Sequence, residues 1–79
     1  MKTLLTSKSQ WHQGDKVDGL YCGVEFSGII NGNTRPTPDY KNVIFCVTLD
    51  NPITVYGHLN STIEVWTNNL YNYIYSVKT

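Results

Sequence analysis

Residues 43–49 read VIFCVTL, and both faces that this stretch would present as a β-strand are largely apolar. Successive side chains of a strand point to opposite faces. One face carries Val43, Phe45, Val47 and Leu49. The other face carries Ile44, Cys46 and Thr48. A strand that is apolar on both faces is usually covered on both, so the stretch predicts a central, buried strand.

The composition of the chain favours β-structure throughout. The 79 residues include no alanine, the best helix former, whereas Val, Ile and Thr supply 22 residues and the aromatic residues ten. These side chains suit the pleated surface of a sheet. With 79 residues, of which 41% are hydrophobic, the chain can form one domain with one core. We therefore expect an all-β domain.

The turn signals divide the chain into five or six short strands. Residues 1–13 are expected to be flexible, with Trp11 folding back onto a single domain formed by residues 14–79. The expected strands are residues 16–22, interrupted at Gly19, 24–30, with a bend or bulge at Gly28, 43–49, 53–56, 63–66 and 70–77.

The segments between these strands carry their own predictions. Residues 50–52 are expected to form a tight turn, because Pro52 fixes its own φ and can only begin a strand. Residues 57–61 are expected to break the sheet as a single 3₁₀ turn, and residues 68–69 to turn the chain through positive φ. Residues 31–42 form a long loop, and long loops on small barrels often carry binding residues.

This layout resembles that of SH3-like barrels. The stretches that carry the resemblance are Gly14-Asp15-Lys16-Val17, Phe26-Ser27-Gly28-Ile29-Ile30 and Ile53-Thr54-Val55-Tyr56. KOW-type modules open with a similar G-D-x-V, and plasmid-encoded type II dihydrofolate reductases are similar over residues 14–65. The resemblance implies a small SH3-like barrel of five to six strands with one 3₁₀ turn, and an OB-like barrel is the next choice.

The reductases also provide a possible activity to weigh. Their active centre uses a V-Q-I-Y strand in the pore of a tetramer, and this chain reads I-T-V-Y there, with Thr54 where the family has glutamine. The resemblance therefore bears on the fold more than on the activity. A reductase is the weakest of the functional alternatives considered for this sequence.

The chemistry-bearing residues form no catalytic or metal-binding pattern. His12, His58, Cys22 and Cys46 match no zinc-site spacing. No nucleophile stands in a recognisable motif, and no glycine-rich loop for phosphate is present. We expect a protein that is not an enzyme and that holds no cofactor and no metal.

Charge and hydropathy limit the partners. The formal net charge is zero, so nucleic acid is not favoured as a partner. No apolar run approaches the ~20 residues that span a bilayer, and the apolar run near the N-terminus is too short for a signal peptide. We expect a cytoplasmic protein with reduced thiols. The many Asn, Ile, Tyr and Lys residues match AT-rich codons and favour a phage or another mobile element as the source.

Three tyrosines near the C-terminus are the first candidate binding feature. Tyr71, Tyr73 and Tyr75 recur with period two and are expected on one face of a strand. That face could contact a protein, stack on bases, or pack into the core with Leu70 and Ile74 outside. These three alternatives stay open at the level of the sequence.

The loop of residues 31–42 is the second candidate, and Trp66 is the third. Arg35 and Tyr40 belong to residue types that often dominate binding energy, although the loop could also be a solvated connector. Trp66 is expected beside Glu64 on an outward face, where it could bind a partner or seal the barrel end. The predicted binding residues are Arg35, Tyr40, Trp66, Tyr71, Tyr73 and Tyr75.

The leading hypothesis is a non-enzymatic protein that acts by protein–protein interaction, with a protein partner or by self-association, through a sheet face and the 31–42 loop. The alternative is a nucleic-acid-binding barrel. That alternative expects Lys16, Arg35 and Lys41 to converge near exposed aromatic side chains.

Overall fold

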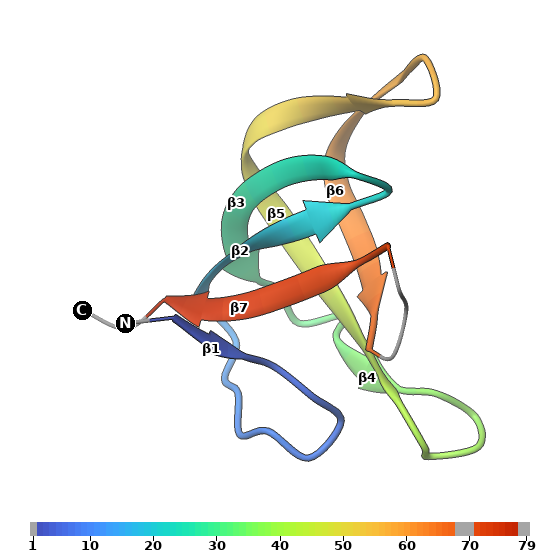
Figure 1. Ribbon diagram of the computed structural model, residues 1–79. Coiled ribbons are helices and arrows are strands. Elements are labelled where there is room, and N and C mark those ends of the chain that lie inside the picture. The colour runs from blue at the N-terminus through green and yellow to red at the C-terminus, as the bar shows by residue number, and fades with distance from the viewer. Residues whose placement is uncertain (1, 68–70, 78–79) are drawn as a thin grey trace.

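A computed structural model describes residues 2–67 and 71–77, and these residues contain seven strands and no helix (Figure 1). None of them belongs to a helix that could cross a membrane. The strands are β1 (Lys2–Leu4), β2 (Lys16–Tyr21), β3 (Val24–Ile30), β4 (Arg35–Pro36), β5 (Val43–Val55), β6 (His58–Trp66) and β7 (Tyr73–Val77). The prediction of an all-β fold is confirmed.

The strands form one antiparallel sheet that curls into a half-barrel. Their order is β1-β7-β2-β3-β5-β4, and β6 pairs with β5 in addition. Figure 1 shows the curl most clearly in β3, which bends from the β2 side of the molecule toward β5. The half-barrel is compatible with a small barrel fold.

The centre of the sheet is β5, as the sequence predicts. It pairs with β3 along residues 47–49, with β4 along residues 43–44, and with β6. Phe45 is completely buried, and Ile44 and Cys46 on the opposite face are also buried. The prediction of a central strand covered on both faces is confirmed.

The core lies on the concave face of the curled sheet. Its members are Leu5, Val17, Phe26, Ile30, Val43, Phe45, Val47, Leu49, Ile63, Val65 and Ile74. The predicted inward positions of Ile63 and Val65 are confirmed. Trp11 does fold back, since its ring meets Phe45 edge-on with 5.9 Å between ring centroids.

The N-terminal segment contributes more to the sheet than expected. Residues 2–4 form β1, which pairs with β7, and Leu5 is buried in the core. The N–H of Leu5 donates a hydrogen bond of 2.9 Å to the carbonyl of Ile74. A three-residue edge strand is too short to show an alternating pattern, which is why the sequence did not reveal it. The sheet therefore begins before residue 14.

Two glycines mark close backbone approaches and not breaks. β2 continues through Gly19, contrary to the expected interruption. A Cβ at this position would lie 1.8 Å from the carbonyl oxygen of Tyr73, so the close approach of β7 requires glycine. Of the bend or bulge expected at Gly28, the bulge is excluded, because β3 keeps its register with β2 there. A Cβ on Gly28 would lie 2.2 Å from the carbonyl oxygen of Thr48. Only glycine lets the strands cross this closely.

The turn predicted at residues 50–52 is wrong, because β5 continues through them to Val55. The pairing with β6 shifts between Thr48 and Ile53, so residues 49–52 stand opposite Ser61 alone. Such a bulge tolerates Pro52, since its missing N–H is not needed in the ladder. The chain reverses later, at Tyr56-Gly57, where φ is 49° and 77°. Positive φ at both central residues suits a two-residue hairpin turn.

The expected 3₁₀ turn is likewise not found at residues 57–61, where the hairpin turn ends and β6 begins. The sequence placed the reversal of the chain at residues 50–52 and a break in the sheet at residues 57–61. In the structure, residues 50–52 lie in the bulge and the chain reverses at Tyr56-Gly57. The turn expected at residues 68–69 lies outside the described residues, as does Leu70.

Replacing Phe45 with alanine should lower the free energy of unfolding by about 3–5 kcal/mol, because it leaves a cavity at the centre of the core. Thr54→Ala is the matched control, since Thr54 is exposed on the same strand and its loss should change stability by less than about 0.5 kcal/mol. Urea denaturation measures both. Equal effects of the two substitutions would show that the faces of β5 are misassigned.

Gly19→Ala should destabilise the fold by at least about 2 kcal/mol, since the added methyl meets a backbone oxygen of β7 that cannot move alone. Gly32→Ala is the control, because its Cβ would meet only the end of the Gln13 side chain, at 3.1 Å. Thermal unfolding of the two variants should separate them clearly. A tolerated alanine at residue 19 would contradict the close crossing of β2 and β7.

Candidate functional site

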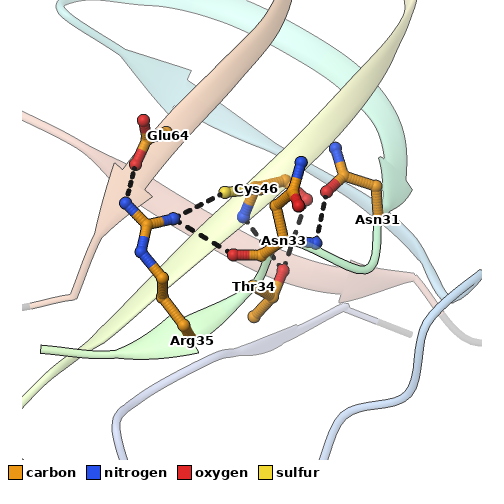
Figure 2. Close-up of polar contacts among 6 residues, drawn as sticks. All are labelled: Asn31, Asn33, Thr34, Arg35, Cys46 and Glu64. Atoms are coloured by element: carbon orange, nitrogen blue, oxygen red, sulfur yellow. Dashed lines mark hydrogen bonds and ion pairs between the residues drawn. The ribbon is translucent and has the colours of Figure 1, made fainter.

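The side chain of Arg35 reaches from β4 across β5 to β6 (Figure 2). Its Nη2 lies 2.8 Å from Oε2 of Glu64 in an ion pair. Its Nη1 donates to the carbonyl of Asn33 at 3.1 Å and to Sγ of Cys46 at 3.4 Å. These contacts fix the guanidinium against the outer face of the sheet.

Arg35 and Trp66 flank the same residue of β5. Arg35 stands opposite Ile44 on one side, and Trp66 stands opposite Ile44 on the other. Ile44 points away from the core, yet it is only 4% exposed, which fits a side chain covered by its two neighbours. Trp66 itself remains 47% exposed. We call Arg35, Ile44, Cys46, Glu64 and Trp66 the outer-face cluster.

The first half of the 31–42 loop is anchored to the edge of β5. β3 and β4 leave a gap beside Cys46, and the loop fills it. The N–H of Asn31 donates to the carbonyl of Cys46 at 2.9 Å, and the N–H of Cys46 donates to the hydroxyl of Thr34 at 3.0 Å. The loop thus takes the place of a neighbouring strand for the backbone of Cys46.

The second half of the loop is closed by its own hydrogen bonds and presents Tyr40. Thr37 is buried, and its N–H donates to the carbonyl of Asn42 at 2.9 Å. The Thr37 hydroxyl and the N–H of Lys41 both donate to the carboxylate of Asp39, which lowers the pKa of Asp39. Tyr40 sits at the tip with φ of 59°, and its side chain is 81% exposed.

The electrostatics of the outer-face cluster keep the Cys46 thiol protonated and Arg35 charged. Burial and the nearby charge of Glu64 raise the pKa of the Cys46 thiol, although Arg35 acts in the opposite direction. The thiol is therefore protonated at neutral pH, whereas a nucleophilic cysteine needs a thiolate. The hydrogen bond and charge of Glu64 raise the pKa of Arg35, which remains a cation.

The tyrosines near the C-terminus divide between a turn and a strand. Tyr73 and Tyr75 lie on the outer face of β7, and Ile74 between them is buried in the core. The alternative in which the tyrosines pack into the core with Ile74 outside is therefore wrong. Tyr73 is 37% exposed, Tyr75 is half-buried, and Tyr71 is well exposed in the turn before β7.

The six predicted residues do not form one surface. Arg35 and Trp66 meet on β4, β5 and β6, with Tyr40 in the loop that joins β4 to β5. The tyrosines of β7 pair instead with β1 and β2, on the other side of β3 in the strand order. The predicted binding residues therefore fall into two groups on different parts of the sheet.

Two of the three cations expected to converge for nucleic-acid binding, Lys16 and Arg35, lie on separate parts of the sheet. Lys16 pairs with Ile29 of β3, which in turn pairs with Thr48 of β5. Arg35 pairs with Ile44 of β5. Thr48 and Ile44 are four residues apart on β5, which corresponds to roughly 13 Å along the strand. Arg35 is also neutralised by Glu64.

Two hollows lie beside predicted residues. A hollow of about 540 Å³ is lined by Tyr21, Asn31, Asn33, Arg35, Cys46, Thr62, Ile63 and Glu64. A second hollow of about 720 Å³ is lined by Lys2, Asp18, Gly19, Leu20, Glu25, Phe26, Ser27, Asn51, Ile53 and Tyr75. Both are wide, open depressions on the surface.

The sequence did not point to Glu64, Ile44 or the anchoring residues Asn31 and Thr34. Arg35 is the only arginine, so a carboxylate partner could be expected, but choosing Glu64 requires the strand register. Among the described residues, no three His, Cys, Asp or Glu side chains gather where they could hold a metal ion. Comparison with protein-family models, with curated proteins and with solved structures finds no significant match to this chain.

The burial of Cys46 predicts unequal reactivity of the two free thiols. In the native protein, iodoacetamide should alkylate Cys46 at least about tenfold more slowly than the half-buried Cys22, because attack requires an accessible thiolate. Peptide mapping by mass spectrometry measures both rates. In urea the rates should become similar, and similar rates in the native protein would contradict the position of Cys46 beneath Arg35.

Proposed function

We propose that this protein is a non-enzymatic binding protein that contacts another protein through the 31–42 loop and the outer-face cluster. The observation that carries the proposal is the presentation of Tyr40, which is 81% exposed at the tip of a loop closed by hydrogen bonds. The hydrogen bonds already fix the backbone of the loop, so little backbone entropy is lost when Tyr40 contacts a partner. Tyrosine, arginine and tryptophan are also the residue types that most often dominate interface energies.

The outer-face cluster supplies a polar contact and an apolar contact beside this loop. Arg35 uses three of its five N–H donors within the chain, on Asn33, Cys46 and Glu64, which leaves two for a partner. The exposed part of Trp66 offers an aromatic surface two residues from Glu64 on the same strand. A partner with carbonyl or carboxylate acceptors beside an apolar side chain would complement these groups.

The proposal includes three statements about the origin and setting of the protein. We infer an SH3-like barrel from the resemblance of the sequence, and the half-barrel is compatible with it. We infer a phage or mobile-element source, so that the partner is a host protein, from the composition. We infer a cytoplasmic location, and two free cysteines suit a reducing compartment.

Substituting both Arg35 and Tyr40 with alanine should reduce capture of the partner at least about tenfold, since two anchoring side chains are lost. The immobilised protein is exposed to lysate of the cells in which it acts, and bound proteins are quantified by mass spectrometry. The melting temperature should fall by only a few degrees, because both side chains lie on the surface.

Tyr56→Ala is the matched control for this experiment. Tyr56 is also a tyrosine with positive φ, and it is 86% exposed, but it lies at the tip of the β5–β6 hairpin, outside the proposed surface. It should retain the partner. If Tyr56→Ala loses the partner and the double variant keeps it, the surface is misplaced. If the captured material is nucleic acid, and binding falls steeply with salt, the protein–protein proposal is wrong.

A further inference from the structure

Among the described residues, β6 is the longest strand that pairs along one edge only. Among residues 2–67 and 71–77, β6 pairs only with β5, although it is nine residues long. The other outer strands, β1 and β4, have three and two residues. Short edge strands are a common protection against pairing with another chain, and β6 lacks this protection.

The hydrogen bonds of Cys46 show which residues of β6 face its free edge. The N–H and C=O of Cys46 bond to Thr34 and Asn31, so they point away from β6. Backbone groups alternate in direction along a strand, so Phe45 and Val47 point toward β6 and bond their opposite residues there. On β6 the N–H and C=O groups of Thr62, Glu64 and Trp66 therefore point outward.

The side chains of β6 do little to prevent pairing. Residues 58–66 read HLNSTIEVW and contain no lysine, arginine or proline. Their one carboxylate, on Glu64, is neutralised by Arg35 within the same chain. The formal net charge of zero means that two copies do not repel each other as a whole. Charge, backbone geometry and strand length thus all leave this edge open to a second strand.

We propose that β6 of a second copy pairs antiparallel with β6 at this edge, which makes a two-fold symmetric dimer with one sheet continuous across both copies. Within residues 62–66, the regular stretch of β6 beyond the register shift, the outward residues are Thr62, Glu64 and Trp66, which are symmetric about Glu64. A two-fold axis at Glu64 therefore places Thr62 opposite Trp66 of the second copy, and every outward N–H and C=O of these residues finds a partner.

The same register gives the ion pair of Arg35 and Glu64 a role in assembly. The axis brings the two Glu64 side chains directly opposite each other, where like charges are unfavourable. Each carboxylate already has an Nη2 of Arg35 at 2.8 Å, so the centre of the interface holds two cations and two anions. Without Arg35, the two carboxylates would stand opposed and uncompensated.

Sedimentation velocity from about 1 μM to about 1 mM protein tests the assembly, with amide hydrogen exchange by NMR at both ends of this range. We expect a monomer–dimer equilibrium. The amides of Ile63 and Val65 should be protected at both concentrations, and those of Thr62, Glu64 and Trp66 only at the higher one. A monomer throughout, or a dimer that leaves these three amides unprotected, would overturn the proposal.

Two substitutions test the register through charge. Arg35→Gln should raise the dimer dissociation constant by roughly two- to fivefold, because it exposes the opposed carboxylates. Adding Glu64→Gln should restore dimerisation, since no charge then remains at the centre. The monomer should tolerate both changes, because exposed ion pairs contribute little to stability. If the double variant dimerises no better than Arg35→Gln alone, the axis does not pass through Glu64.

Thr62→Pro tests the backbone contact independently of charge. It removes one outward N–H and no hydrogen bond to β5, so the variant should fold and should dimerise more weakly. Unchanged dimerisation of a folded variant would show that the contact lies elsewhere. Dimerisation and capture of a partner protein are separate measurements, so failure of this inference and failure of the proposed function can be told apart.

Discussion

The burial of residues 43–47 of β5 on both faces, between β3 and β4 along one edge and β6 along the other, is the constraint on which the rest of the structure depends. Phe45 is completely buried on the core side, and Ile44, which stands between Arg35 and Trp66, is buried on the other side. The backbone groups of a strand this deeply placed must all find hydrogen-bond partners. β3, β4 and β6 supply most of them, and the 31–42 loop supplies those of Cys46.

The candidate site follows from this backbone requirement. Asn31 and Thr34 form hydrogen bonds with the edge of β5, which keeps the chain close to the sheet. The next two residues, Arg35 and Pro36, then pair with β5 as the short strand β4. The remainder of the loop is then short enough to close on itself through Thr37 and to project Tyr40. The same hydrogen bonds of Cys46, together with the register of β5 and β6, show which backbone groups of β6 face outward. The proposed recognition by the loop and the proposed self-association by β6 thus both depend on how the edge of β5 at Cys46 is paired.

The sequence predicts the interior of this protein better than its turns. Alternation identified β3, the central strand and the inward positions of Ile63 and Val65, because burial on one face leaves a period of two in the residues. The predictions at Pro52 and Gly19, which rested on the type of a single residue, were wrong. Pro52 suggested a turn but lies in a bulge, and Gly19 suggested a break but permits a close crossing with β7. Those outcomes depend on neighbours that are distant along the chain.

The sequence identified residues of the candidate site from their residue types, but it did not show which of them lie together. Arg35, Tyr40 and Trp66 stand out as residue types common at interfaces, and the structure brings Arg35 and Trp66 to the same residue of β5. Glu64 lies 29 residues from Arg35, so their pairing depends on the register of β5 with β6. The tyrosine stripe suggested one surface, whereas β7 begins at Tyr73 and holds only two of the three tyrosines.

Native-state hydrogen exchange measured across a series of sub-denaturing urea concentrations tests the central position of β5 most directly. If β5 holds the sheet together, the amides of Phe45 and Val47 exchange only through global unfolding, with the full free energy and the full urea dependence of the unfolding transition. Amides of β1 and of the β2–β3 hairpin open at lower free energies. Exchange of Phe45 and Val47 by a local opening, with little dependence on urea, would contradict the account.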